Sequence, residues 1–192
     1  MRILVLDNYD SFTYNLVHII RELGYGEGMD VIRNDKITID EVNQYDKILL
    51  SPGPGIPSEA GIMHPLIRTY GPTKSILGIC LGHQGIGEIY GASLYNMKDV
   101  LHGVATPARI YDDLFQRGAD NFTVCRYHSW AVDGNTVNGS MIITAVDDEG
   151  IVMGLSHETH DVRGLQFHPE SILTQHGKQL MKNWLQHEYN CK

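Results

Sequence analysis

The chain has 192 residues, enough for one domain with a substantial core, and its 42% apolar and 20% charged residues are ordinary for a globular protein. Its net charge of -8 argues against nucleic acid or an anionic membrane as the main partner. The three cysteines, Cys80, Cys125 and Cys191, form no disulfide framework and favour a reducing, cytoplasmic location. No apolar run has the length of a signal peptide or a membrane span, and we expect residues 1–192 to form a single domain.

The first part of the chain alternates buried strands with helices. Apolar runs and helically spaced apolar residues predict strands at 3–6, 29–33, 47–51 and 75–79, and helices at 12–23, from 38, at 59–70 and after 80. Ser11 is the expected N-cap of the first helix, and Thr38 with Glu41 has the pattern of a capping box. This alternation predicts a three-layer α/β fold, with a mostly parallel central sheet and helices on both faces.

The pattern changes in the second half of the chain. Short apolar runs at 92–96, 108–111, 122–127, 141–146, 151–156 and 162–167 are separated by turn-like segments. Since no long helix fits between them, we expect strands joined by hairpins, which form an antiparallel C-terminal extension of the sheet. A helix at 177–189 closes the chain.

Cys80 lies at the junction between the strand at 75–79 and the helix that follows it. Gly78 and Gly82 flank it by two residues on each side, so strand and helix can pass closely and leave the sulfur uncovered. The positive end of the helix favours a thiolate and a developing oxyanion beside it. A buried structural cysteine is the alternative interpretation, and the choice between them depends on a nearby base.

His168 is the candidate base because it directly follows the strand at 162–167. Pro169 then stiffens the turn that presents Glu170, which can orient the imidazole. Although 88 residues separate His168 from Cys80, the carboxyl ends of parallel strands share one edge of a sheet, where the two side chains can meet. A turn histidine with a chance carboxylate partner is the alternative.

Two further segments invite a functional interpretation. Residues 51–57, SPGPGIP, contain three prolines and two glycines, which favours a rigid loop at the ligand-binding edge of the sheet over a simple connecting turn. His157 and His160, together with His83 or His128, suggest zinc. Their surroundings match no structural zinc spacing, so we expect no metal.

These motifs together carry a family resemblance. Residues 78–84 (GICLGHQ) resemble the nucleophile motif of class I, triad-type glutamine amidotransferases, 168–170 (HPE) resemble their His-Pro-Glu motif, and 51–55 (SPGPG) resemble their oxyanion loop. Residues 7–15 and 126–129 are also similar to the small glutaminase subunits of anthranilate synthase and aminodeoxychorismate synthase. The resemblance implies the class I glutamine amidotransferase fold, which has a flavodoxin-like core.

What the resemblance implies for activity is hydrolysis of L-glutamine. Cys80 would attack the side-chain amide, while His168, held by Glu170, would take the thiol proton and deliver it to the leaving ammonia. Backbone N–H groups of Leu81 and of the loop 53–55 would form the oxyanion hole. The residues implied for the oxyanion hole and for glutamine binding are Leu81, Gly53, Pro54, Gly55, Gln84, Ser129 and Trp130.

The resemblance also implies a partner, a larger chorismate-binding synthase subunit that receives the ammonia and holds magnesium, so this chain needs no cofactor of its own. Anthranilate synthase of tryptophan biosynthesis is the main expectation, and aminodeoxychorismate synthase of folate biosynthesis is the alternative. A stand-alone cysteine hydrolase of related fold and a non-enzymatic binding module also remain open. Residues 104–106 differ from those usual in the related subunits, within a loop that resembles one at the subunit contact. Trp130 stands at a position where those subunits often have leucine.

Overall fold

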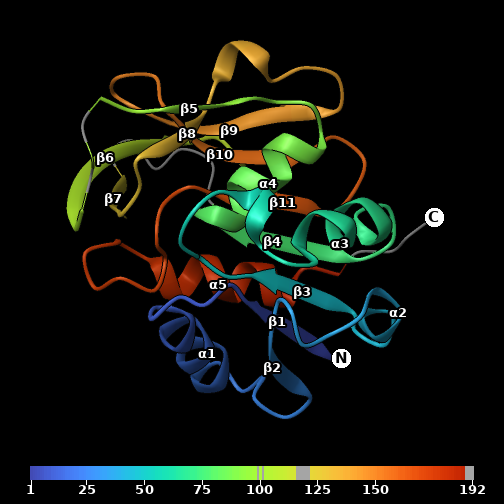
Figure 1. Ribbon diagram of the computed structural model, residues 1–192. Helices are drawn as coiled ribbons and strands as arrows, with labels where there is room; N and C mark the ends of the chain where they lie inside the picture. Colours follow the sequence, from blue (N-terminus) through green and yellow to red (C-terminus); the bar gives the residue numbers. More distant parts are fainter. Residues whose placement is uncertain (99, 101, 116–121, 189–192) are drawn as a thin grey trace.

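The computed structural model describes residues 1–98, 100, 102–115 and 122–188. Figure 1 shows its elements in chain order. The strands are β1 (Ile3–Asp7), β2 (Met29–Arg33), β3 (Lys47–Leu50), β4 (Ser75–Ile79), β5 (Leu94–Asn96), β6 (Val104–Ile110), β7 (Phe122–Arg126), β8 (Trp130–Val132), β9 (Met141–Asp147), β10 (Val152–His157) and β11 (Val162–Leu165). The helices are α1 (Thr13–Glu22), α2 (Ile39–Val42), α3 (Met63–Tyr70), α4 (Leu81–Ile89) and α5 (Gly177–Gln186), with 3₁₀ turns η1 (Pro57–Glu59) and η2 (Gly134–Thr136).

Within the described residues, nine strands form one sheet in the order β2-β1-β3-β4-β11-β10-β9-β6-β7. Strands β2, β1, β3, β4 and β11 run parallel, whereas β10, β9, β6 and β7 pair antiparallel. The parallel part has the 2-1-3-4-5 order of flavodoxin-like sheets, with β11 in the fifth place. The α/β fold with an antiparallel extension, predicted from the sequence, is therefore confirmed.

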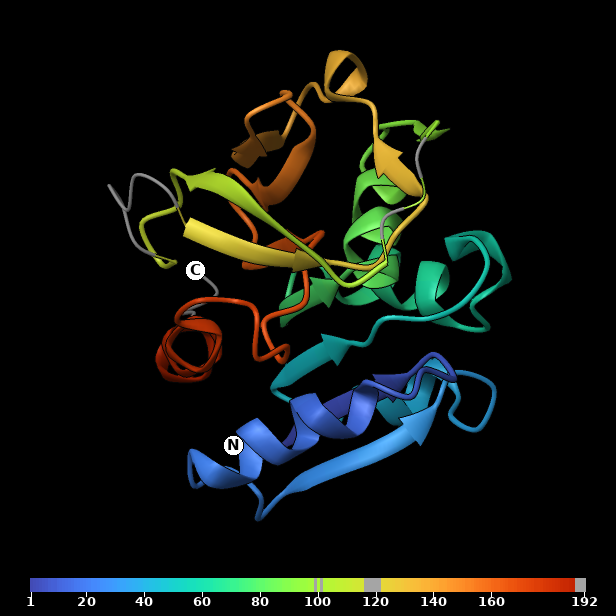
Figure 2. The same ribbon diagram turned by 90° about the vertical axis from the view of Figure 1, so that its left-hand side faces the viewer.

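Helices cover the parallel strands on both faces because these strands are apolar on both sides (Figure 2). Ile3 and Val5 of β1 face a core shared with α1 and α5. Leu4 and Leu6 face the opposite core, which α2, α3 and α4 share. The period-two alternation of β1 thus builds the two interior layers, and it fixes the register of the sheet.

Three predicted elements differ from the structure. Strand β6 begins at Val104 rather than at residue 108, because its first half is largely exposed and has no apolar run. The run at 92–96 forms only β5, which leaves the main sheet and pairs with β8, a three-residue strand that the sequence pattern missed. Helix α5 ends at Gln186, and the predicted last residue, Tyr189, lies outside the described residues.

Two helices begin at residues other than those predicted from the sequence. Phe12, not Ser11, occupies the N-cap of α1, and no side chain caps that helix; instead the Asp10 carboxylate accepts the Phe12 N–H at 2.7 Å. The predicted helix at 59–70 begins only at α3, because Gly61 adopts a φ of 52° against the Asn34 backbone. The Thr38–Glu41 capping box is confirmed.

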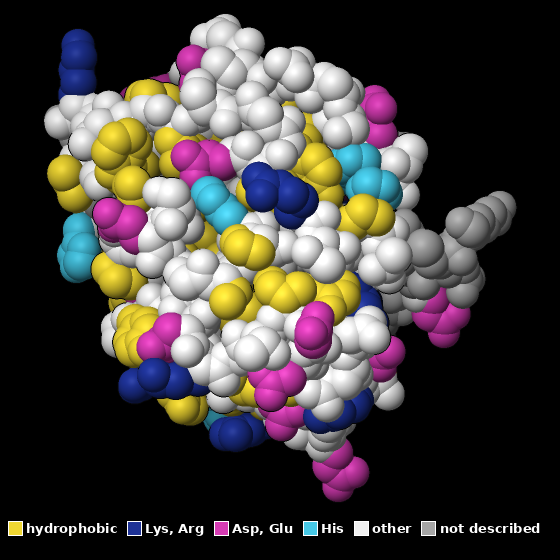
Figure 3. Space-filling view, turned by 45° about the vertical axis from the view of Figure 1, so that its right-hand side comes forward, with side chains coloured by type: hydrophobic (Ala, Val, Ile, Leu, Met, Phe, Trp, Pro, Cys, Tyr) yellow, Lys and Arg dark blue, Asp and Glu magenta, His cyan; other side chains and the backbone are white. Residues whose placement is uncertain are grey.

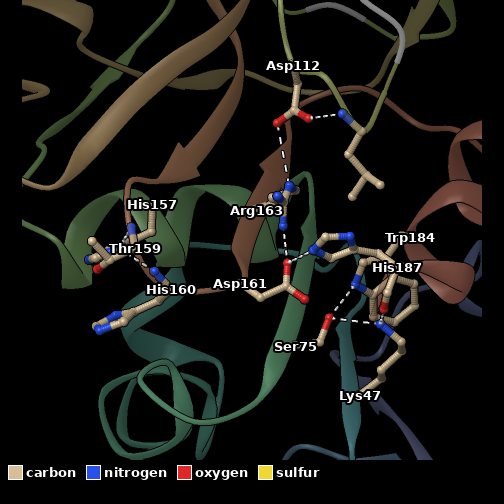
Figure 4. Close-up of polar contacts among 11 residues, drawn as sticks. Lys47, Ser75, Asp112, His157, Thr159, His160, Asp161, Arg163, Trp184 and His187 are labelled. Carbon is tan, nitrogen blue, oxygen red and sulfur yellow. Dashed lines mark hydrogen bonds and ion pairs between the residues drawn. The ribbon is translucent and has the colours of Figure 1, made fainter. Parts of the chain in front are cut away.

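The C-terminal helix is tied to the amino ends of two central strands (Figure 4). Trp184 Nε1 donates to Ser75 Oγ at 3.1 Å, and Lys47 Nζ donates to the same oxygen at 3.1 Å and to the His187 carbonyl at 2.9 Å. Burial lowers the pKa of Lys47. These bonds fix the C-terminal end of α5 at the edge of the sheet where the parallel strands begin. The N-terminal end of α5 packs against Pro169, in the turn after β11.

Two general properties of the molecule bear on possible partners. Among the described helices, none combines the length and apolar character needed to cross a membrane. On the face in Figure 3, basic side chains stand singly or in small groups among acidic and hydrophobic ones.

Candidate active site

Cys80 occupies a sharp turn between β4 and α4. Its backbone has φ 51° and ψ -98°, a strained conformation for a residue with a side chain, and it precedes the first residue of α4. A Cβ on Gly78 would lie 2.4 Å from the Gly82 carbonyl carbon, and one on Gly82 would lie 2.7 Å from Leu50 Cβ. Only glycines allow strand and helix to approach so closely, as the sequence analysis expected.

His168 and Glu170 meet this turn at the same edge of the sheet. Strand β11 pairs in parallel with β4, with Leu165 opposite Ile79, and the Cys80 N–H donates to the Leu165 carbonyl at 2.8 Å. His168 Nδ1 donates to Glu170 Oε1 at 2.6 Å, and the His168 side chain is 2% exposed. The structure therefore brings together the three residues predicted from positions far apart in the chain.

The surroundings of His168 favour its charged form. Burial lowers the pKa of the imidazole, but the Cys80 and Glu170 side chains outweigh it and raise the pKa to about 10. Nε2 is buried without a hydrogen bond of ordinary geometry, and catalytic hydrogen bonds are often long before substrate binds. A thiolate beside an imidazolium is the charge arrangement that a cysteine nucleophile needs.

Two aromatic rings hold the His168 imidazole in place. The Tyr127 ring lies 5.0 Å from it at 72°, and the Phe12 ring lies 5.6 Å away at 71°. Edge-to-face contacts of this kind restrict rotation of the imidazole. The His168 N–H also donates to the Cys125 carbonyl at 3.0 Å, so β7 fixes the backbone of the turn.

Replacing Glu170 with glutamine should lower the pKa of His168, because a neutral amide stabilises the imidazolium less than a carboxylate does. In the unmodified protein, the Hε1 proton resonance of His168 should titrate near pH 10. In Glu170→Gln, NMR should place this titration at a lower pH. Glu22→Gln is the matched control, because Glu22 forms its ion pairs with the exposed His18 and Lys178. An equal titration pH for His168 in both variants would contradict the assignment of Glu170.

The predicted oxyanion loop packs directly against the start of α4. A Cβ on Gly53 would lie 2.6 Å from Leu81 Cδ2 and 2.7 Å from Asn8 Cβ, and Gly55 has a φ of 75°. Leu81 is the first residue of α4, so its N–H has no acceptor within the helix. The loop 53–55 thus packs against the residue that directly follows Cys80.

Ser51 and Asn8 lock this loop to the end of β1. Asn8 donates from its backbone N–H to Ser51 Oγ and from its side chain to the Ser51 carbonyl, both at 2.8 Å. Asn34 Nδ2 donates to Asn8 Oδ1 at 3.0 Å, so Asn8 is bonded on both sides. Pro54 and Leu81 line a neighbouring pocket of about 310 Å³. The sequence analysis missed the role of Asn8, whose signal is a polar residue directly after a buried strand.

Gln84 lies inside the site, with 3% of its surface exposed, rather than on a helix surface. Its Nε2 donates to the Trp130 carbonyl at 2.9 Å and to Gln166 Oε1 at 3.2 Å. The Ser129 carbonyl accepts the Met97 N–H at 2.7 Å, which joins the segment before β8 to the segment after β5. Gln84, Ser129 and Trp130 are therefore brought together.

Gln166 is a site residue that the sequence analysis missed. It is fully buried, and its Nε2 lies 3.6 Å from Cys80 Sγ. Its only signal in the sequence is an uncharged polar residue between the apolar Leu165 and Phe167 at the end of a buried strand. A buried polar side chain in such a run has a hydrogen-bonding reason to be there.

His157 and His160, considered for zinc, form a stacked pair with ring centroids 4.0 Å apart (Figure 4). His157 Nδ1 accepts the backbone N–H groups of Thr159 at 3.1 Å and His160 at 3.0 Å. Among the described residues, no group of three or more His, Cys, Asp or Glu side chains is placed to hold a metal ion. The hydrogen bonds of His157 stabilise the turn between β10 and β11, which gives the pair a structural role.

Comparisons with known proteins agree with this geometry. Residues 4–187 match the family model described as "Glutamine amidotransferase class-I". "Anthranilate synthase component 2" of Thermus thermophilus is 44% identical over 192 residues, which cover 97% of this chain and 92% of that protein. "Aminodeoxychorismate synthase component 2" of Klebsiella aerogenes is 42% identical over 186 residues, covering 95% and 98%. "Bifunctional protein TrpGD" of Thermotoga maritima is also 42% identical, but the match covers 96% of this chain and only 32% of that longer protein.

Solved structures show the same architecture. A crystal structure of a putative GMP synthase subunit from Thermoplasma acidophilum superposes with a TM-score of 0.84 and 27% identity, covering 96% of this chain and 92% of that one. The family match over nearly the whole chain and the relatives above 40% identity point to the same assignment. The chain belongs to the class I glutamine amidotransferase family.

Proposed function

We propose that this chain is the glutaminase subunit of anthranilate synthase. It hydrolyses L-glutamine with Cys80, His168 and Glu170 and supplies the ammonia to a chorismate-binding synthase subunit. The observation that carries the proposal is the meeting of Cys80 at the end of β4 with the His168–Glu170 pair after β11. We further propose that residues 1–192 act as one amidotransferase domain, because strands from both halves of the described chain share a sheet.

The reaction has two halves. The Cys80 thiolate attacks the amide carbon of glutamine, and the carbonyl π electrons move onto its oxygen. When this tetrahedral intermediate collapses, the C–N bond breaks and the His168 imidazolium protonates the departing nitrogen, which leaves as ammonia. Water, deprotonated by the now neutral His168, then attacks the thioester, releases glutamate and regenerates the thiolate and the imidazolium. Glu170 keeps Nδ1 protonated, so that Nε2 performs both proton transfers.

The negative oxygen of both intermediates needs donors that are already in position. The Leu81 N–H at the positive end of α4 and an N–H from the loop 53–55 are the proposed oxyanion hole. The contact between Gly53 and Leu81 keeps these two donors together. Substituting Gly53 would push the loop off Leu81, since no space exists there for a Cβ.

The remaining contacts orient the α-groups of glutamine. Both N–H groups of the Gln84 amide are used by Trp130 and Gln166, so its Oε1 is left to accept from the α-ammonium. The Ser129 and Trp130 carbonyls are engaged with Met97 and Gln84, and a carboxylate cannot bond to a carbonyl. We therefore assign the α-carboxylate to N–H donors of the Ser129–Trp130 backbone, and Pro54 and Gly55 to the opposite wall.

The partner is inferred from the relatives. Proteins named anthranilate synthase component 2 and aminodeoxychorismate synthase component 2 match nearly the full chain, and both names describe one component of a synthase. A Bacillus subtilis relative, 40% identical, carries both names, so aminodeoxychorismate synthesis is the second candidate. A cytoplasmic location fits the free thiols of Cys80 and Cys125.

Reconstitution with a chorismate-binding synthase subunit tests the function. The purified chain is mixed with that subunit, chorismate, magnesium and glutamine, and the amine product is identified by fluorescence and mass spectrometry. We expect anthranilate and equimolar glutamate. Aminodeoxychorismate as the product would select the second candidate, and glutamate release that does not depend on the partner would support the stand-alone hydrolase. Absence of glutamate under all conditions would contradict the proposed activity.

A further inference from the structure

Buried hydrogen bonds form a continuous line from the antiparallel strands to the Cys80 sulfur. It begins at Asp147, at the end of β9, and passes through Arg126 and His128 to the Trp130 carbonyl. From that carbonyl it continues through Gln84 and Gln166 to Cys80. The chemistry of each group decides which atom donates at every step.

The Trp130 carbonyl fixes the direction at the centre of the line. A carbonyl oxygen can only accept, so Gln84 Nε2 at 2.9 Å and His128 Nδ1 at 2.8 Å must both donate to it. This assigns the NH₂ group of Gln84 and the ring proton of His128 without ambiguity. Both lone pairs of the carbonyl are thereby occupied.

The direction continues from Gln84 to the nucleophile. The second N–H of Gln84 faces Gln166 at 3.2 Å, and because it donates, the atom of Gln166 there is the carbonyl oxygen. The NH₂ group of Gln166 therefore points the other way, and it lies 3.6 Å from Cys80 Sγ. Gln166 is fully buried, so no water competes for this donor.

At the other end, His128 is held in one tautomer. With the proton on Nδ1, Nε2 is an acceptor, and Arg126 Nε donates to it at 3.1 Å. Arg126 Nη1 lies 2.6 Å from Asp147 Oδ2, and Asp147 Oδ1 accepts two backbone N–H groups of the turn between β9 and β10. Burial, with help from the Arg126 charge, lowers the pKa of His128 to about 4, so the ring stays neutral at physiological pH.

We propose that Gln166 stabilises the Cys80 thiolate by donating an amide N–H to the sulfur, and that Arg126 and His128 are positioning residues that fix its direction through Trp130 and Gln84. A donor hydrogen-bonded to the charged form of an acid favours that form. If His128 rotated, the Trp130 carbonyl would lose one of the two donors that hold it in place, and the acceptor that orients Gln84 would be free to move. The proposal rests on the proposed function only in taking Cys80 as the nucleophile.

The pH dependence of Cys80 alkylation tests this role directly. Iodoacetamide reacts with the thiolate, and mass spectrometry of the peptide that carries Cys80 separates its rate from those of other cysteines. In Gln166→Leu, the midpoint pH of this reaction should rise by about one unit, because a hydrogen bond to the charged sulfur is lost. Below the midpoint pH, where the thiolate is the minor form, kcat for glutamine hydrolysis should fall about tenfold. Gln186→Leu is the matched control, since Gln186 is exposed on α5.

A second pair of variants tests the direction of the line. In Gln166→Glu, a carboxylate replaces the donor, so the midpoint should rise further than in Gln166→Leu. In Arg126→Lys, the side chain cannot hold Asp147 and His128 together, and both the alkylation midpoint and the KM for glutamine should rise. Circular dichroism is used first to check that each variant is folded. A midpoint in Gln166→Leu equal to that of Gln186→Leu would overturn the proposal.

The alkylation profile separates this proposal from the proposed function. It depends on the charge of Cys80 and not on which amide the enzyme hydrolyses. If the reconstituted complex used no glutamine while the Gln166→Leu midpoint still rose, the proposed function would fail and the role of Gln166 would stand. If glutamine were hydrolysed but the midpoint did not move, only the role of Gln166 would fail.

Discussion

Replacing Cys80 with serine should reduce glutamine hydrolysis by about 10⁶-fold, the size of effect seen when a catalytic nucleophile is removed. A serine hydroxyl is far harder to deprotonate than a thiol, so the charge pair with His168 is lost. Serine fits the strained turn, because its side chain differs from that of cysteine by one atom. The measurement is glutamate release by the chain together with its chorismate-binding partner.

The same variant contains its own control. Ammonia added at high concentration bypasses the Cys80 chemistry, so ammonia-dependent synthesis by the complex should continue at an unchanged rate. This result would show that fold and assembly are intact and that only the glutamine step is lost. Glutamate release retained near the unmodified rate would show that Cys80 is not the nucleophile.

Replacing Gly177 with alanine should have the second-largest effect, although this residue is not part of the triad. A Cβ at Gly177 would lie 1.9 Å from the Pro169 carbonyl oxygen and 2.8 Å from its carbon. Pro169 stands between His168 and Glu170, so the catalytic turn or helix α5 has to move. We expect a loss of about 3 kcal/mol in unfolding free energy and about a 10²-fold fall in kcat, because small displacements of catalytic groups are costly.

Urea unfolding and steady-state kinetics measure the two parts of this prediction. Gly26→Ala is the matched control, since the three atoms nearest to a Cβ there all belong to Arg21, and the closest is the flexible side-chain Cγ, 3.1 Å away. It should leave kcat unchanged and alter stability by less than about 1 kcal/mol. If Gly177→Ala behaved like Gly26→Ala, the close packing of α5 on the catalytic turn would be wrong.

The meeting of Cys80 and His168 could be predicted because it depends on topology rather than on side-chain detail. Apolar runs predict β4 and β11, and parallel strands place their carboxyl ends on one edge, so residues 88 apart become neighbours. The glycines around Cys80 are likewise explained by local geometry, since a Cβ on either Gly78 or Gly82 would lie within 3 Å of a neighbour's backbone or Cβ. Glu170 follows from its place two residues after His168 in a stiff turn.

The polar contacts around Gln166 could not be predicted, because they join segments distant in the sequence whose spacing carries no signal. Arg126 bonds both to His128, two residues further along the chain, and to Asp147, which lies at the end of β9. Strand β8 was missed because its three residues are too few to show a pattern, although its Trp130 carbonyl is central to the site. Such contacts exist only once the antiparallel strands have folded against the parallel ones.

The most direct test of the central claim is to locate where a glutamine analogue attaches when an electrophilic carbon replaces its amide. The chain is incubated with the analogue alone and in the presence of excess glutamine, and the modified peptide is sequenced by mass spectrometry. The geometry predicts one adduct, on Cys80, which glutamine suppresses and which Cys80→Ser does not form. An adduct on another residue, or no adduct in the folded complex with its partner, would contradict the assignment of Cys80 as the nucleophile.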